Sequence, residues 1–108
     1  MSISGAKRGA AARGRKDANQ TEIVKALEKV GAMVIDLHTV GGGCPDIMVG
    51  FRGRNYILDV KTPEGTLTPA QKEFFEIWPG QAGITRTVDE ALAFIGAEEF
   101  VFSGEGVA

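Results

Sequence analysis

The alternation of hydrophobic and polar residues divides the chain into seven predicted elements. A helix is predicted over residues 17–31, where apolar residues recur at three- and four-residue spacing. This apolar stripe comprises Ile23, Val24, Leu27 and Val30. Asn19 and Glu22 fit a capping box at the start of the helix, and Gly31 fits its C-terminal end.

Three short strands are predicted next, over residues 32–38, 45–51 and 55–61. The run Gly41-Gly42-Gly43 ends the first strand, and Arg52-Gly53-Arg54-Asn55 is a short hairpin connection between the second and the third. Because side chains alternate along a strand, Tyr56, Leu58 and Val60 share one face of the third strand. Ile57, Asp59 and Lys61 share the other face.

The remaining pattern predicts a helix, a strand and a helix. Thr68-Pro69-Ala70-Gln71 combines an N-cap threonine, a first-turn proline and a glutamine three residues later. We expect this helix to present Phe74, Phe75 and Trp78 to the core. A fourth strand is predicted over 82–87, and Thr87 caps a last helix. The order αβββαβα predicts an α/β fold with a mixed central sheet of about four strands flanked by helices.

The composition limits the kinds of site that the chain can build. Its 108 residues suit one domain, and no apolar run approaches the ~18 residues of a membrane span. A single cysteine, Cys44, excludes an internal disulfide and suits a cytoplasmic protein. With one histidine, His38, any metal would be bound by oxygen, which favours Mg²⁺ or Mn²⁺. The glycine run lacks the Lys-Ser/Thr ending of a P-loop, so we expect no nucleotide cofactor.

The charge is distributed unevenly along the chain. The formal net charge is −2, but residues 1–16 contain five basic residues and no acidic one. These are Lys7, Arg8, Arg13, Arg15 and Lys16. The other seven basic residues stand against fourteen acidic ones in residues 17–108, a net −7. A basic flexible arm on an acidic body is typical of a phosphate-seeking tail, although a solubilising leader has the same composition. Arg52 and Arg54 could also contact phosphates, or could be ordinary turn residues.

Candidate chemistry lies at the ends of the second and third strands. Asp46 precedes the second strand, and Asp59 and Lys61 share a face of the third. Such charges are costly in a buried strand unless they bind a metal or perform chemistry. Two ordinary explanations stay open: Asp46 could be a turn aspartate, and Asp59 and Lys61 could form a weak ion pair on a solvated face.

Three segments together resemble a known group of enzymes. They are Gly43-Cys44-Pro45-Asp46, Asp59-Val60-Lys61 and Leu67-Thr68-Pro69-Ala70-Gln71. In their order along the chain they are similar to the PD-(D/E)xK nuclease superfamily, and within it to small VRR-NUC type proteins common in phages. The resemblance implies a restriction-endonuclease-like core and a single nuclease domain over residues 17–97. Residues 98–108 would be a tail or an edge strand.

The resemblance also implies a Mg²⁺-dependent DNA endonuclease, with Mn²⁺ as a substitute. Asp46, Asp59 and the backbone carbonyl of Val60 would hold one or two metal ions against the scissile phosphate. Lys61 would position the attacking water or help to deprotonate it. Gln71 would join this catalytic group, although its position also fits a simple capping role.

The first helix departs from the family pattern. Related proteins commonly place a glutamate near its start, two residues before a second acid; these positions are Gln20 and Glu22 here. Gln20 could accept a hydrogen bond from a metal-bound water but carries no charge. Glu22 could stand in as a ligand or serve only in the capping box.

We therefore expect an endonuclease that acts as a homodimer. Preference for branched or four-way junction DNA is an expectation by analogy alone. Two alternatives stay open: a nucleic-acid-binding module that has the nuclease fold with weak or lost cleavage, and a protein-interaction subunit whose basic arm is only a tail.

Overall fold

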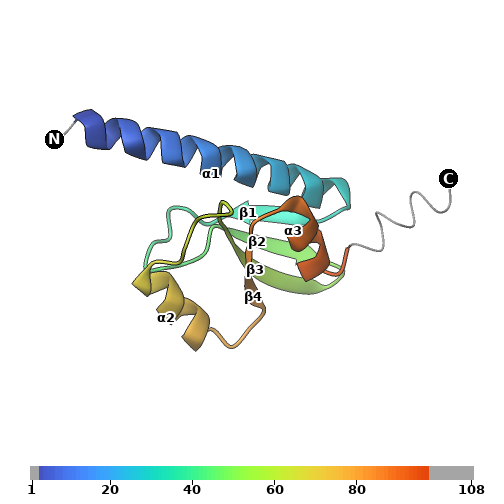
Figure 1. Ribbon diagram of the computed structural model, residues 1–108. Coiled ribbons are helices and arrows are strands. Elements are labelled where there is room, and N and C mark those ends of the chain that lie inside the picture. The colour runs from blue at the N-terminus through green and yellow to red at the C-terminus, as the bar shows by residue number, and fades with distance from the viewer. Residues whose placement is uncertain (1–2, 98–108) are drawn as a thin grey trace.

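The computed structural model describes the backbone of residues 3–97 and the side chains of residues 14–97. Its elements follow the predicted order (Figure 1): α1 (Ile3–Lys29), β1 (Met33–Asp36), β2 (Ile47–Phe51), β3 (Arg54–Val60), α2 (Pro69–Ile77), β4 (Ala82–Thr85) and α3 (Val88–Phe94). The predicted α/β class with a mixed four-stranded sheet is confirmed. Residues 98–108, expected as a tail or edge strand, lie outside the described residues.

The first helix is longer than the sequence pattern predicted. We expected it to begin near Asp17, but α1 begins at Ile3 and runs through the segment expected to be a flexible arm. The physical reason is composition, since alanine, lysine and arginine have high helix propensity and fill most of residues 3–16. The capping box of Asn19 and Glu22 is therefore wrong, because both residues lie inside the helix. The division into arm and domain stays a prediction.

The four strands form one sheet in the order β1-β2-β3-β4. β2 pairs antiparallel with both β1 and β3, whereas β3 and β4 are parallel. A two-residue turn, Arg52-Gly53, joins β2 to β3, and the φ angles of these residues are 51° and 79°. Positive φ at both positions is the type I′ geometry that matches the twist of a hairpin. This short turn fixes the register of the two strands.

One face of the sheet is covered by α1 and α3 (Figure 1). The side chains that β2 and β3 contribute to this core are Ile47, Val49, Phe51, Tyr56, Leu58 and Val60. They pack against Ile23 and Leu27 of α1, against Ala91 and Leu92 of α3, and against Ile95, which follows α3. Because strand side chains alternate, Asp59 projects from the opposite face of β3.

The helix α2 begins with the predicted capping box. The Gln71 N–H donates to Thr68 Oγ1 at 3.2 Å, and the Thr68 N–H donates to Gln71 Oε1 at 2.9 Å. The prediction that the α2 aromatic residues fill the core is wrong, because no residue of α2 is buried. Phe74 instead stacks on Trp78 with ring centroids 5.3 Å apart. The helix lies beside the sheet, away from α1 and α3, so its aromatic side chains pack on one another (Figure 1).

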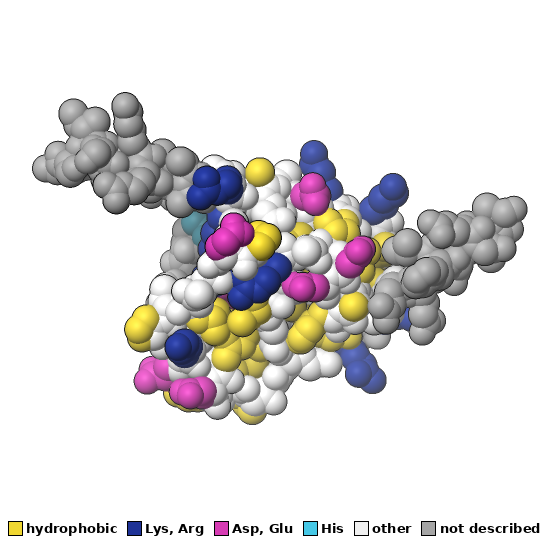
Figure 2. Space-filling model, viewed as in Figure 1, with side chains coloured by type: hydrophobic (Ala, Val, Ile, Leu, Met, Phe, Trp, Pro, Cys, Tyr) yellow, Lys and Arg dark blue, Asp and Glu magenta, His cyan; other side chains and the backbone are white. Residues whose placement is uncertain are grey.

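The face of the molecule seen in Figure 2 carries side chains of both charges around a central apolar area. Large apolar side chains that are exposed come from several elements: Met33, Ile35, Val40, Ile77, Trp78 and Phe94. In the part of the chain that the structure describes, no helix has the length and apolar character needed to cross a membrane.

Candidate active site

Two carboxylates lie close together at the open end of the β2–β3 hairpin. The paired register of the two strands ends at Ile47 and Leu58, and Asp46 and Asp59 are the next residue on each side. Asp46 Oδ2 accepts the Val60 N–H at 2.8 Å, so Asp46 lies against the strand that carries Asp59. The negative charge of Asp46 is near enough to raise the pKa of Asp59. The fold thus brings together two acids that the sequence separates.

Asp59 and Lys61 form a buried ion pair. The Asp59 residue is 0% exposed and Lys61 is 8% exposed. Lys61 Nζ lies 3.2 Å from Asp59 Oδ2. This contact lacks hydrogen-bond geometry, and Oδ2 is a buried acceptor without a hydrogen bond among the described residues. Burial of this oxygen is compensated only by the ion pair with Lys61 among the described residues, so this end of the sheet is suited to a further cation.

Gln71 connects α2 to this ion pair. Its Oε1 accepts from Lys61 Nζ at 2.9 Å, and its Nε2 donates to Asp59 Oδ1 at 3.4 Å. The same Oε1 accepts the Thr68 N–H of the capping box. The sequence left open whether Gln71 caps its helix or contacts the acid pair, and its side chain does both. The start of α2 therefore orients the two charged groups on β3.

The surroundings of Asp59 disfavour its charged form. The pKa of Asp59 is raised to about 6, mainly by burial and then by the negative charge of Asp46, against the opposing effect of Lys61. Cys44 lies close enough to feel the same charges. Burial raises the pKa of its thiol, and the charges of Asp46 and Asp59 raise it further. Both effects favour the protonated thiol over the thiolate, which is the nucleophilic form of cysteine.

Both oxygens of Asp46 have partners. Oδ2 accepts the backbone N–H of Val60 at 2.8 Å, and Oδ1 lies 3.1 Å from Lys16 Nζ. The first contact ties Asp46 to the strand that carries Asp59. The second joins α1 to the site, because Lys16 lies on that helix. Lys16 was expected to bind DNA as part of a basic arm, but its partner in the structure is a site carboxylate.

Two residues to which the sequence assigned no role at the site hold the ends of β3 and β4. Asn19 Nδ2 donates to the carbonyls of Lys61 at 3.0 Å and Arg86 at 3.1 Å. The Arg86 guanidinium donates to the carbonyls of Thr62 and Gly65 at 2.7 and 2.8 Å. These bonds fix the backbone from Lys61 to Gly65. The sequence indicated a capping role for Asn19, but Asn19 lies inside α1 and its side chain donates to these two strand carbonyls instead.

Gly43 allows the loop before Asp46 to contact the start of α2. Its φ is +80°, and a Cβ there would lie well under 3.0 Å from the carbonyl oxygen of Ala70. A side chain at this position would push away the first turn of α2, which carries Gln71. The glycine run, interpreted from the sequence as a flexible turn, thus includes a position with a packing requirement.

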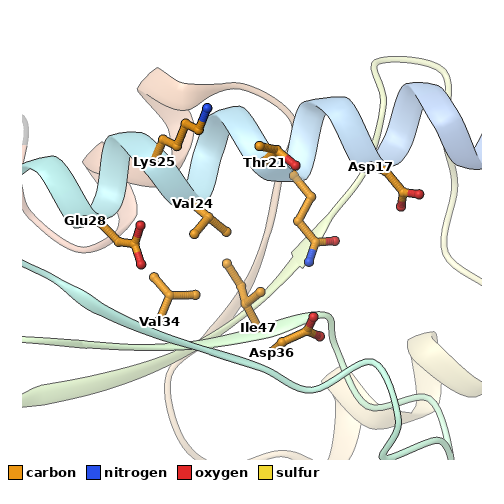
Figure 3. Close-up of a pocket in the computed structure, with 9 residues that line it drawn as sticks. Asp17, Thr21, Val24, Lys25, Glu28, Val34, Asp36 and Ile47 are labelled. Atoms are coloured by element: carbon orange, nitrogen blue, oxygen red, sulfur yellow. The ribbon is translucent and has the colours of Figure 1, made fainter.

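Gln20 and Glu22 lie on different sides of α1. Gln20 lines a groove of about 490 Å³ between α1 and β1, whose other lining residues include Asp17, Glu28 and Asp36 (Figure 3). Glu22 is exposed and does not line this groove. Gln20 lies one turn after Lys16 and hence on the helix face toward Asp46. No hydrogen bond or ion pair within the described part of the chain joins Gln20 or Glu22 to the two acids.

Among the other predicted DNA-binding residues, those whose side chains the structure describes have no hydrogen bond or ion pair with the two acids. Arg15 is exposed on α1 beside Lys16. The side chains of Lys7, Arg8 and Arg13 lie outside the described ones. Arg52 and Arg54 stand at the hairpin tip, at the opposite end of β2 from Asp46. The length of β2 puts about 17 Å between that tip and the acids, at roughly 3.3 Å per residue.

The donor set fits a hard divalent cation. Asp46, Asp59 and the carbonyl of Val60 offer only oxygen, and the buried Asp59 Oδ2 has no hydrogen bond. Within the described residues, no group of three or more His, Cys, Asp or Glu side chains is placed to hold a metal ion. Two carboxylates suffice for Mg²⁺, which keeps several waters and takes few protein ligands.

Comparison with solved structures identifies the fold. The chain is similar to a structure described as a VRR_NUC domain, with a TM-score of 0.61 and 18% sequence identity. The match covers 74% of this chain and 92% of that chain. No protein-family model matches the chain, and no curated protein matches it. The predicted resemblance is confirmed at the level of the fold: the chain has the α/β, restriction-endonuclease-like fold of a VRR_NUC domain.

Proposed function

We propose that the protein is a divalent-metal-dependent endonuclease that hydrolyses phosphodiester bonds in DNA. The observation that carries this proposal is the buried Asp59 Oδ2 without a hydrogen bond, which lies next to Lys61 on the strand that Asp46 contacts through the Val60 N–H. A pair of carboxylates and a lysine at one sheet end is the minimal equipment for metal-assisted hydrolysis of phosphodiesters. Similarity to a nuclease-type fold supports the same class of reaction.

The residues of the site divide the chemical work. Asp46, Asp59 and the Val60 carbonyl would hold Mg²⁺ or Mn²⁺, and a bound ion supplies a Lewis acid for water and phosphate. The Lys61 ammonium would stabilise the negative charge that develops on the phosphate and position the attacking water. Gln71 keeps Lys61 in place through the 2.9 Å bond to its Nζ. Asn19 does the same for the Lys61 backbone.

DNA is the proposed partner because α1 extends from the site with a run of basic residues. Arg15 and Lys16 lie where α1 passes the acids, and Lys7, Arg8 and Arg13 precede them in the same helix. Positive charge beside a hydrolytic site attracts the phosphate backbone. A homodimer and a preference for branched DNA extend this proposal, since a two-fold dimer presents two equivalent sites to opposite strands.

A cleavage assay tests the proposal. Linear, nicked, flapped and four-way DNA are incubated with the protein in Mg²⁺ or Mn²⁺, and with Asp46→Asn and Asp59→Asn. We expect each substitution to reduce the cleavage rate roughly a thousandfold, the scale of losing a main electrostatic contribution to catalysis. Asp17→Asn, an exposed acid of α1, is the matched control and should cleave like the original protein. Cleavage that persists in both site variants would exclude this assignment.

A binding module with weak or lost cleavage is the second candidate. It is favoured by Gln20, which puts an uncharged side chain on the helix face toward the acids, and by the Lys16 ammonium at Asp46. This candidate requires DNA binding with no cleavage of any substrate in either metal. The four-substrate assay, combined with a gel-shift measurement on the same DNA, separates the two.

A further inference from the structure

Lys16 makes a contact that the proposed hydrolysis does not use. Its Nζ lies 3.1 Å from Asp46 Oδ1, across 30 positions of the sequence. The Lys16 side chain is 33% exposed and that of Asp46 is 14% exposed. This ion pair joins the basic segment of α1 directly to one of the two candidate metal ligands.

The ammonium and a divalent cation would compete for the same oxygen. The other oxygen of Asp46, Oδ2, already accepts the Val60 N–H at 2.8 Å, so Oδ1 is the one available to a metal. Mg²⁺ binds carboxylate oxygens at roughly 2.1 Å in a strict octahedral arrangement. An ammonium that shares that oxygen would lie within a few ångströms of the ion, where like charges repel strongly.

The charge balance of the site indicates what the displaced Lys16 ammonium would bind. Asp46 and Asp59 are balanced by Lys16 and Lys61, so a divalent ion would leave the four residues with an excess of positive charge. The natural acceptor of that excess is a phosphate group. Because a third of the Lys16 side chain is exposed, the ammonium can leave Asp46 without crossing the protein interior.

We propose that Lys16 is a positioning residue that competes with the divalent metal for Asp46 and, once displaced, binds a phosphate of the DNA. This inference rests on the proposed nuclease function. Under this proposal metal binding and DNA binding are cooperative, because the metal releases the Lys16 ammonium and the DNA phosphate then binds it. Lys16 would therefore pair with Asp46 before the metal binds and with a DNA phosphate after it has bound.

Metal affinity tests the competition without any need for cleavage. Mn²⁺ binding to the full chain is measured by electron paramagnetic resonance, for the original protein and for Lys16→Met, Lys16→Arg and Arg15→Met. Arg15→Met is the matched control, because it removes a neighbouring positive charge that is exposed on the same helix. Thermal unfolding in EDTA verifies that each variant is folded.

We expect Lys16→Met to bind Mn²⁺ about two to five times more tightly than the original protein, the range of a partly exposed ion pair. Lys16→Arg keeps the competing charge and should bind Mn²⁺ like the original. Arg15→Met should change the affinity less than twofold. An affinity of Lys16→Met that is equal to or weaker than that of the original protein overturns the competition.

DNA binding in Ca²⁺ tests the second half of the proposal. Lys16→Met should weaken DNA binding and reduce the slope of log affinity against log salt by about 1, as expected for one lost phosphate contact. An unchanged affinity and slope would overturn the transfer of Lys16 to the phosphate. If the original protein and Lys16→Met both bind no Mn²⁺, the proposed function fails together with this inference. If both bind it equally, only the inference fails.

Discussion

The two ends of the β2–β3 hairpin are built from the same pair of strands and differ in almost every other respect. At one end, Arg52 and Gly53 form a turn within four consecutive residues, and Arg52 and Arg54 are exposed. At the other end, Asp59 and Lys61 are buried, and side chains from α1 and α2 reach them. The hairpin tip is local structure, whereas the acid end is assembled from distant segments.

This difference shows how to weigh charged residues in a small fold. An exposed arginine keeps its hydration and costs almost nothing, so its presence at a turn carries little information about function. A fully buried aspartate loses its hydration, and Asp59 also lies near the negative charge of a second acid. The fold tolerates this cost at one end of the hairpin only. That end is where chemistry is expected.

Removing one cation from each end should give the largest contrast. We expect Lys61→Met to reduce the cleavage rate about a thousandfold, because the ammonium next to Asp59 is lost from a buried site. Arg54→Met removes an exposed positive charge at the tip and should change turnover at saturating DNA less than threefold. Single-turnover cleavage with each variant gives the comparison. Equal losses in both variants would remove the distinction between the two ends.

A glycine substitution at each end should give a smaller contrast. Gly43 and Gly53 have nearly equal φ angles, +80° and +79°, but a Cβ would clash with the Ala70 carbonyl only at Gly43. Gly53→Ala should cost about 1 kcal/mol of unfolding free energy from backbone strain alone. Gly43→Ala should cost about 2–4 kcal/mol, since the clash adds to the strain.

Activity adds a second measurement to this glycine pair. Displacement of the first turn of α2 by Gly43→Ala would move Gln71 away from Lys61, so cleavage should fall about tenfold, in the range of lost supporting contacts. Gly53→Ala should keep full activity. Urea unfolding and cleavage rates are measured on both variants. Similar unfolding free energies for the two would show that the contact between the loop and α2 is unimportant.

The same contrast between local and distant contacts explains what the sequence could predict. The hairpin, the capping box of Thr68 and Gln71, and the N-cap at Thr87 depend on neighbouring residues and were predicted correctly. Each of these features is determined by residues that lie a few positions apart in the sequence.

Contacts between distant segments were beyond the sequence pattern. The bonds of Asn19 span 42 and 67 positions, and the ion pair of Lys16 spans 30. Nothing near Lys16 in the sequence distinguishes it from the basic residues around it. The Phe74 and Trp78 error has the same origin, because helical spacing predicts an apolar stripe but not which surface covers it. Tertiary placement decides both cases.

The last predicted effect, on stability alone, concerns the burial of Asp59 itself. Its pKa of about 6 lies above the ordinary value of 3.8, so the folded protein binds a proton that the unfolded chain releases. Between these two values, stability falls as the pH rises, and it levels off above about pH 6. Asp59→Asn carries no charge and escapes this loss. It should therefore be more stable than the original protein by about 1–2 kcal/mol at pH 8, less than the full shift implies because Lys61 loses its partner. Near pH 4 the two proteins should be nearly equally stable.

Urea unfolding in EDTA at several pH values checks this prediction. Asp17→Asn, which removes an exposed acid, is the control and should follow the original protein. If Asp59→Asn instead loses stability at pH 8, the buried carboxylate stabilises the fold, and its burial needs no functional explanation.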